Sequence, residues 1–448
     1  LRTSHITSTH PVGRGSIDAM KVVFIGAGSA FGGRVSVDVL SREPLQDSTI
    51  GLCDTNADRL ATVQSYVKKV TDSNGLSANI IGSTDRRDLL QDADFVLLSV
   101  AIGGPAYYGE PFDSEMNIPA KYGIVQTVAD TMGPGAIFRA LRTAPVMFEM
   151  IEDINRMAPK ATILNYTNPM AILTWLFNEK AEVPVVGLCH GVQGNASRLA
   201  EMAEVPLDEI QYICAGINHM TWFTKFEHGG HNLLPELTKR LIDESKSSDP
   251  YQFRGEVAEV FGYYSTESDR HFPEYVPWFQ NGDRGLFDPH IERTRGIKGK
   301  RQHWYEDMGV AIDKADSVEL IRSHEWASAI MEAKTTGVPQ VFSGNVMNTS
   351  LIENLPKQAC VEVPCTVDGN GIHPHHIGKL PIQCAALCKS NIIMQELCVE
   401  AIRRRSKETA FQALLMDPIT QANLTIGRAR DMFEELWESE GQLLSAYH

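Results

Sequence analysis

The chain has 448 residues, of which 43% are hydrophobic and 22% are charged, and these fractions are ordinary for a globular protein. Its formal net charge of −15 argues against nucleic acid or anionic membranes as the main partner. No apolar run is long enough to span a bilayer, so we expect no membrane partner, and the length allows two domains.

The first 19 residues differ from the rest of the chain. They are polar and basic, they begin with Leu1, and they lack the hydrophobic centre of a signal peptide. We expect residues 1–19 to be a disordered leader or a remnant of an expression tag, outside the fold.

A dinucleotide-binding turn is predicted near the start of the fold. The strand-like segment Lys21–Ile25 runs into Gly26-Ala27-Gly28, and a helix-like segment follows. Glycines there allow a tight turn and the close approach of a diphosphate, whose charge faces the amides at the helix start. An ordinary strand–turn–helix that needs small residues is the alternative.

An acid at the end of the second predicted strand supports this reading. The strand at 48–53 ends at Asp54, at about the distance where an acid binds the ribose hydroxyls. Because Asp54 would repel a 2′-phosphate, we expect NAD rather than NADP.

The alternation of strands and helices continues to about Asn195. Further strands are predicted at 78–81, 93–100, 161–164 and 183–188. Such βαβ units indicate an α/β fold with a doubly wound, parallel Rossmann-type sheet. We therefore expect an NAD-binding domain at 20–195 and an α+β domain for substrate, metal and oligomerisation at 196–448.

Two asparagines follow the strand at 161–164. Asn165 ends the strand, and Asn168 precedes Pro169. An Asn restricted by a following Pro can hold a ligand hydroxyl, although Asn-Pro is also an ordinary turn.

Candidate metal ligands end two later strands. Cys189 and His190 follow the strand at 183–188, and His219 follows the strand at 213–217. Thiolate and imidazole both bind metals. The residues alone favour a structural role, because buried Cys is common and no close-spaced pair of ligands is present.

Several motifs occur in a fixed order along the chain. They are Gly26–Ser29, Asn165–Met170, Gly187–His190, Gly216–His219, Ser323–Glu325, 345–356, Val361–Pro364, Val367–Asp368 and Gly371–Ile372. Together they resemble glycoside hydrolase family 4, a family related in fold to lactate and malate dehydrogenases. The resemblance covers nearly everything from Met20 onward, and its specificity lies in the order of motifs that are weak alone.

The resemblance implies an NAD-dependent glycosidase mechanism, which differs from the usual scheme of two carboxylates. NAD would oxidise the C3 hydroxyl of the sugar, and the resulting ketone would acidify the C2 proton. A base would remove that proton, the glycosidic oxygen would leave from C1, water would add, and the hydride would return to C3.

The resemblance also implies the metal and the branch of the family. Cys189 and His219 match the family's metal ligands, and it implies Mn²⁺, although ligand softness alone would favour zinc. His190 replaces the Asp of the 6-phosphoglycosidases, which indicates non-phosphorylated α-galactosides, α-glucosides or glycuronides. His190 would contact the sugar or assist the leaving group, and packing beside the metal is the alternative.

The remaining site residues are expected as follows. The residues that would contact NAD are Gly26, Gly28, Ser29, Ala30, Phe31, Asp54, Val100, Ala101 and Asn165. Asn168 would bind the substrate. The family's base is a tyrosine, for which we expect Tyr263, with Tyr264 as its rival. A phenol with a pKa of about 10 needs help near neutrality, which the metal and NAD⁺ would supply.

A cationic stretch between Arg293 and Arg301 is unusual in this acidic chain. A solvated loop is the ordinary interpretation. The functional one is that Arg295 recognises an anionic sugar, such as a uronate or a sulfonated sugar.

The main alternative function is an NAD-dependent dehydrogenase of a small hydroxy acid or sugar, which would share the first half of the chain. The eight scattered cysteines favour reduced thiols and a cytoplasmic enzyme over a disulfide framework. The family implies a homodimer or homotetramer.

Overall fold

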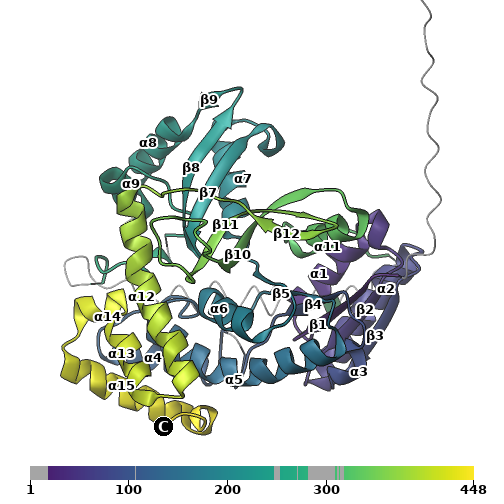
Figure 1. The fold of residues 1–448 in the computed structure, drawn as a ribbon, viewed down its shortest axis with the longest axis horizontal. Helices are drawn as coiled ribbons and strands as arrows, with labels where there is room; N and C mark the ends of the chain where they lie inside the picture. Colours follow the sequence, from purple (N-terminus) through teal and green to yellow (C-terminus); the bar gives the residue numbers. More distant parts are fainter. Residues whose placement is uncertain are drawn as a thin grey trace, which may run out of the picture.

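The computed structural model describes residues 19–105, 107–246, 253–269, 271–280, 308–309, 312 and 317–448. Its strands form one sheet in the order β3-β2-β1-β4-β5-β6-β10-β11-β7-β8-β9, and β12 pairs with β11 (Figure 1). Arg295 lies outside the described residues.

The first six strands are parallel throughout. They are β1 (Lys21–Ile25), β2 (Thr49–Cys53), β3 (Asn79–Ser83), β4 (Phe95–Leu98), β5 (Thr162–Asn165) and β6 (Val185–Gly187). The order 3-2-1-4-5-6 is that of dinucleotide-binding sheets, so the predicted Rossmann-type fold is confirmed.

The helices of this half connect the parallel strands, except for α7, which follows the last of them, β6. They are α1 (Ala30–Leu40), α2 (Ala57–Ser73), α3 (Arg87–Leu90), α4 (Phe112–Lys121), α5 (Gly133–Met157), α6 (Met170–Lys180) and α7 (Gly191–Ala203).

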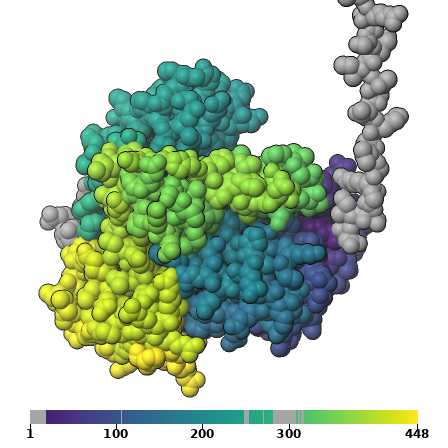
Figure 2. Space-filling view, in the orientation of Figure 1, coloured from purple at the N-terminus to yellow at the C-terminus, as the bar shows by residue number. Residues whose placement is uncertain are grey.

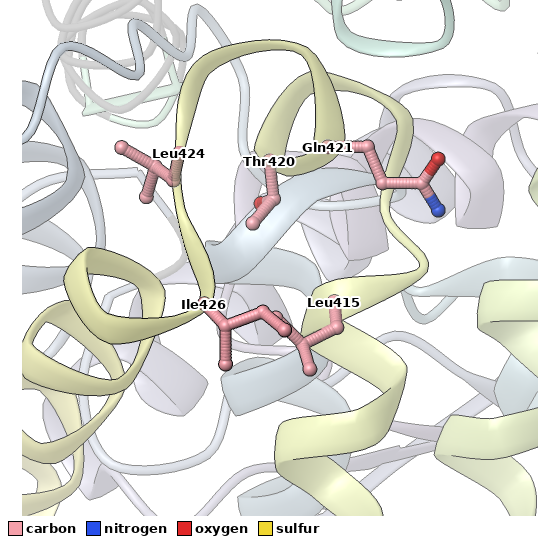
Figure 3. Close-up of a pocket in the computed structure, with 5 residues that line it drawn as sticks. All are labelled: Leu415, Thr420, Gln421, Leu424 and Ile426. Atoms are coloured by element: carbon pink, nitrogen blue, oxygen red, sulfur yellow. The ribbon is translucent and has the colours of Figure 1, made fainter.

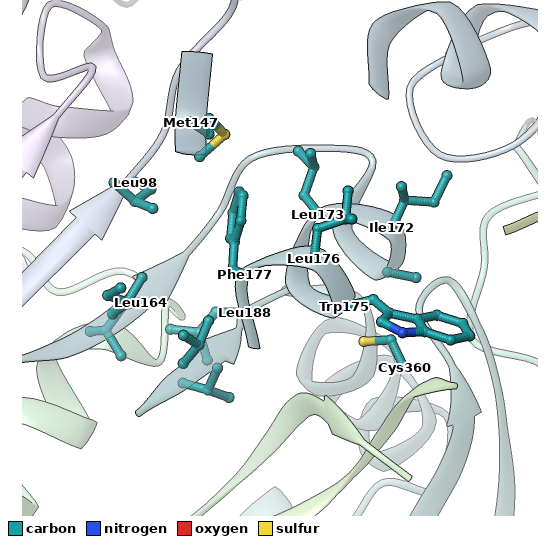
Figure 4. Packing of buried hydrophobic residues seen from close by; sticks show 14 of the residues in the cluster. Leu98, Met147, Leu164, Ile172, Leu173, Trp175, Leu176, Phe177, Leu188 and Cys360 are labelled. Atoms are coloured by element: carbon teal, nitrogen blue, oxygen red, sulfur yellow. The ribbon is translucent and has the colours of Figure 1, made fainter. Parts of the chain in front are cut away.

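Helix α6 lies in the centre of the core. Its first eight residues are all buried, which suits a helix that is apolar on every side. Figure 4 shows side chains of α6 beside Leu98, Leu164 and Leu188 of the parallel half, and beside Cys360 of a later strand. The core therefore continues from the first half of the chain into the second.

The second half extends the same sheet with antiparallel strands. They are β7 (Gln211–Ile217), β8 (Met220–His228), β9 (His231–Asn232), β10 (Gln340–Met347), β11 (Cys360–Asp368) and β12 (Gly371–Pro374). The halves are joined where Asn345 of β10 pairs with Gly187 of β6. This mixed half agrees with the expected α+β character, and the division at residue 195 stays a prediction.

Helices cover the antiparallel half and form the C-terminal end of the chain. They are α8 (Leu234–Ser245), α9 (Phe253–Phe261), α11 (Ala327–Thr336), α12 (Ile382–Arg404), α13 (Lys407–Leu415), α14 (Pro418–Asn423) and α15 (Ile426–Glu440). Short 3-10 helices lie at Glu43–Leu45, Leu207–Glu209, Phe272–Glu274 and Gly441–Leu444.

The C-terminal helices α13, α14 and α15 pack as a lobe against α4 and α5, coloured yellow in Figures 1 and 2. The ring of Phe433 lies 5.4 Å from that of Phe138 and 5.3 Å from that of Phe411, which joins α15 to α5 and α13. A surface pocket between these helices is lined by Leu415, Thr420, Gln421, Leu424 and Ile426 (Figure 3). In the described part of the chain, no helix has both the length and the apolar character needed to cross a membrane.

Candidate active site

The turn after β1 has the geometry that a dinucleotide requires. Gly26 has a φ of 88°, and a Cβ there would lie 2.0 Å from the carbonyl oxygen of Ser99. A Cβ on Gly28 would lie 2.5 Å from the carboxyl carbon of Asp54. Neither position can therefore accept a side chain without a local rearrangement.

Asp54 is fixed beside this turn. Its carboxylate accepts hydrogen bonds from the backbone N–H groups of Gly28, at 2.8 Å, and Asn56, at 2.9 Å. Ser29 caps α1 by accepting a hydrogen bond from the N–H of Gly32. The residues present fit NAD, because a helix N-terminus for the diphosphate and an acid for the ribose lie side by side.

The second wall of the cleft follows β4 and β5. The N–H of Val100 donates to the hydroxyl of Thr167 at 3.1 Å, and Ala101 is exposed. Asn165 is fully buried, and its amide bonds both the N–H and the carbonyl oxygen of Thr167. In this structure Asn165 shapes the loop, and its contact with NAD stays a prediction. Phe31 packs edge-on against Tyr166 at 4.9 Å.

Cys189 and His219 meet although they come from different strands. Cys189 follows β6, His219 occupies the turn between β7 and β8, and the distance from Sγ to Nε2 is 3.4 Å. In zinc sites, ion-to-ligand distances of about 2.3 Å for sulfur and about 2.1 Å for nitrogen place such atoms roughly 3.1–3.6 Å apart. The pair fits one ion, and the N–H of Gly191 at the start of α7 also points at the sulfur.

An acidic loop packs against His219 on its other side. Oε2 of Glu267 lies 2.5 Å from Nδ1 of His219 and 3.3 Å from Nδ1 of His271. Burial alone would raise the pKa of Glu267, but the two histidines outweigh burial and hold that pKa well below its ordinary value. Glu267 and His271 are ligand-type residues that the sequence did not single out. Their spacing of four within the predicted tyrosine loop was the available signal.

Asp130 contacts both Asn168, the predicted substrate-binding residue, and His271. Its Oδ2 accepts hydrogen bonds from the side chains of Asn168 and Tyr107, both at 2.8 Å, and its Oδ1 lies 3.8 Å from Nε2 of His271. Asn168 is therefore linked to His219 through Asp130 and His271, whose Nδ1 lies 3.2 Å from Nδ1 of His219. Asp130 was missed because it lies in the polar loop before α5, which carries no local pattern of its own.

His190 is the exposed member of the site. Its side chain is 77% exposed, and Nδ1 lies 3.6 Å from Oε1 of Glu325. The nearby carboxylate of Glu325 raises the pKa of His190 to about 9. Because its side chain is exposed, His190 is accessible to a ligand that enters the site, as a residue that contacts the sugar must be.

The three tyrosines of the loop have different surroundings. Tyr263 is half-buried. Tyr264 is 1% exposed and packs on Phe223 in a separate apolar cluster, and its hydroxyl has no partner among the described residues. Tyr275, fully buried, stacks on the ring of His219 at 6.3 Å, and its hydroxyl lies 3.5 Å from Nε2 of His271. The role of Tyr263 as the base stays a prediction.

Comparisons with known proteins identify the family of the chain. A model of the family 4 glycosyl hydrolases matches residues 21–205, and a model of the family 4 glycosyl hydrolase C-terminal domain matches residues 214–420. An alpha-galactosidase from Bacillus subtilis is 38% identical over 95% of this chain and 99% of that protein. An alpha-galacturonidase from Thermoanaerobacter italicus is 26% identical over 96% of this chain and 98% of that protein.

A solved structure extends the likeness to the fold. A 6-phospho-alpha-glucosidase from gut microorganisms, in complex with NAD and Mn²⁺, superposes with a TM-score of 0.82. It is 20% identical and covers 95% of this chain and 99% of that chain. The resemblance inferred from the motifs is confirmed. The chain belongs to glycoside hydrolase family 4 and is a glycoside hydrolase.

Proposed function

We propose that this enzyme hydrolyses a non-phosphorylated α-galactoside with bound NAD and a divalent metal ion. The observation that carries the proposal is the Cys189–His219 pair, whose Sγ and Nε2 lie 3.4 Å apart. Cys189 follows the end of β6, so the pair lies toward the carboxyl edge of the parallel strands, where the Gly26–Gly28 turn also lies.

The cofactors are proposed from the chemistry of the residues and from the relative whose structure contains NAD and Mn²⁺. When bound, NAD would take up and return the C3 hydride, and the metal would polarise the C3 carbonyl and so acidify the C2 proton. Cys189 and His219 would hold the ion. Asp54 would accept the ribose hydroxyls, and the amides at the start of α1 would bind the diphosphate.

The other residues would act on the sugar. The tyrosine base removes the C2 proton. Asn168 and Asp130, joined by a hydrogen bond of 2.8 Å, present an amide and a carboxylate to sugar hydroxyls. His190 replaces the acidic residue of the phosphoglycosidase branch and contacts the sugar or its leaving group.

An α-galactoside is favoured because the alpha-galactosidase from Bacillus subtilis shares 38% identity over nearly the whole chain. A uronate is the second candidate, because of the likeness to an alpha-galacturonidase and the cationic stretch that includes Arg295. Family membership favours hydrolysis over the dehydrogenase alternative.

The deciding experiment assays nitrophenyl α-galactoside, α-glucoside and α-galacturonide with NAD⁺ and Mn²⁺, and omits each cofactor in turn. We expect turnover of the galactoside that requires both cofactors, without net NADH. Running the reaction in D₂O should place deuterium at C2 of the product. Retention of the original C2 hydrogen, or activity after NAD⁺ and metal are removed, would contradict the mechanism.

The Arg295→Met variant separates the two substrate classes. Selective loss of galacturonide turnover would support a uronate site, and equal loss on both substrates would exclude it.

The assembly and the compartment stay predictions. We infer a homodimer or homotetramer from the family, to be measured by light scattering coupled to size exclusion. A cytoplasmic location is supported by all eight cysteines being buried, free thiols.

A further inference from the structure

We propose that Glu267 is a positioning residue for the metal ligand His219. In this proposal, which rests on the metal site of the proposed function, Glu267 fixes the imidazole ring so that Nε2 faces Cys189 and the ion. Glu267 itself does not bind the ion.

The two ring nitrogens of His219 face different groups. Nε2 lies 3.4 Å from the sulfur of Cys189, whereas Nδ1 lies 2.5 Å from Oε2 of Glu267 and 3.2 Å from Nδ1 of His271. An imidazole that binds an ion through Nε2 keeps its hydrogen on Nδ1. A carboxylate can only accept, so Glu267 accepts the Nδ1 hydrogen and leaves the Nε2 lone pair for the ion.

The backbone at His219 does not by itself orient the ring. His219 lies in the tight turn between β7 and β8 with a φ of 66°, a left-handed conformation that is uncommon for a side chain of this size. The turn places the ring at the edge of the site but does not by itself choose which nitrogen faces Cys189. The contact with Glu267 makes that choice.

Glu267 is held by the segment that precedes it. The N–H of Thr266 donates to the carbonyl oxygen of Thr221 at 3.0 Å, and the hydroxyls of these two residues lie 2.6 Å apart. The N–H of Phe223 donates to the carbonyl oxygen of Tyr264 at 3.1 Å. This segment therefore lies along β8, which begins directly after His219, so the two side chains are carried by adjacent paired segments.

His271 also contacts the carboxylate of Glu267. Its Nδ1 lies 3.3 Å from Oε2 of Glu267, and its Nε2 lies 3.1 Å from Oε2 of Glu274. Glu274 also accepts a hydrogen bond from the N–H of Val128, at 2.8 Å. The ring of His219 is thus anchored through Glu267 and His271 to the loop before α5.

A competing arrangement uses the same residues. The donor atoms of His219, Glu267 and His271 all lie within 4.8 Å of one another and could hold an ion between them. That ion would use Nδ1 of His219, which faces away from Cys189, so Cys189 would be dispensable. The two arrangements therefore predict opposite results for variants of Cys189.

The test measures the affinity of the metal-free enzyme for Mn²⁺ by EPR titration, with thermal unfolding recorded for every variant. Glu267→Gln should weaken Mn²⁺ binding about 10–100-fold, the usual effect of changing an outer partner, because a neutral amide accepts the Nδ1 hydrogen less strongly than a carboxylate and can also turn an N–H toward the ring. Glu209→Gln is the matched control, because Glu209 contacts His228 at 3.1 Å on an exposed surface, and it should bind Mn²⁺ like the wild type. Cys189→Ala should bind Mn²⁺ far more weakly than the wild type, Glu267→Gln or Glu209→Gln.

Substitution of Co²⁺ for Mn²⁺ allows the bond between the ion and Cys189 to be followed by absorption spectroscopy. At saturating Co²⁺, Glu267→Gln should keep the charge-transfer band of the Cys189 thiolate, because both ligands of the ion remain. Wild-type Mn²⁺ affinity in Glu267→Gln, together with loss in Cys189→Ala, would overturn the proposal and leave the metal site intact. Wild-type affinity in Cys189→Ala, with loss in Glu267→Gln and His271→Ala, would overturn both the proposal and the assigned ligands.

Discussion

At the scale of single residues, the site depends on pairs from distant parts of the chain. Cys189 and His219 could be predicted as candidates because each directly follows a strand. Asp130 and Glu267 were not singled out, because both lie in loops whose convergence is produced by long-range packing, and the spacing of four between Glu267 and His271 was the one local signal. Hydrogen-bond partners across such distances leave no periodic pattern in a single sequence.

The choice of base can be tested at this scale. Tyr263→Phe should lower kcat by about 10²–10⁴-fold and abolish deuterium incorporation at C2, because a phenyl ring cannot accept the proton. Tyr264→Phe is the control: its hydroxyl is buried without a partner among the described residues, so its removal should leave exchange unchanged. Full exchange in Tyr263→Phe, with loss in Tyr275→Phe, would move the role to the tyrosine that stacks on His219.

A second residue-scale prediction concerns Asp417, the N-cap of α14. It is fully buried, and Oδ2 accepts hydrogen bonds from the N–H and the hydroxyl of Thr420. Burial raises its pKa to about 7. Because the folded state then holds a proton that the unfolded chain has released, stability falls as pH rises from about 4 to about 7.

Asp417→Asn keeps the acceptor for Thr420 and removes the titration. Its free energy of unfolding relative to the wild type should therefore increase across that window, by up to about 4 kcal/mol for a group of this burial. Urea unfolding at pH 4.5, 6 and 8 measures this difference. A difference that is constant with pH would show that Asp417 titrates normally.

At the scale of elements, the parallel strands could be predicted from the sequence, and the joining of the two halves of the sheet could not. Strands near 48–53, 78–81, 161–164 and 183–188 were predicted close to where β2, β3, β5 and β6 lie. The pairing of β6 with β10 joins residues 158 positions apart, Gly187 and Asn345. Alternation of strands and helices says nothing about an antiparallel partner so far along the chain.

Helix α6 packs in the core that the two halves of the sheet share. Phe177 is fully buried beneath the sheet, so Phe177→Ala should lower the free energy of unfolding by about 3–5 kcal/mol. Ile382→Ala is the control on another helix, because Ile382 is 82% exposed and its truncation should cost less than about 0.5 kcal/mol. Chemical denaturation of both variants measures the contrast, and equal effects would contradict the described packing.

At the scale of the whole molecule, one sheet and one continuous core cross the expected boundary at residue 195. In the intact chain, β6 is covered by β10 at its edge, and α6 packs against both β10 and β11. A dehydrogenase-like domain that ended at residue 195 would expose the edge of β6 and the apolar face of α6. Exposed edges and apolar faces of this kind favour aggregation.

The fragment 20–195 should therefore fail to fold alone, although it contains every strand of the parallel sheet. We expect it to be insoluble, or to unfold without cooperativity in near-UV circular dichroism, and to bind NAD far more weakly than the full chain. Adding the fragment 196–448 during refolding should restore a cooperative transition, because β10 and β11 supply the missing edge and cover. A soluble fragment 20–195 that unfolds cooperatively and binds NAD as tightly as the full chain would show instead that the two halves are independent domains.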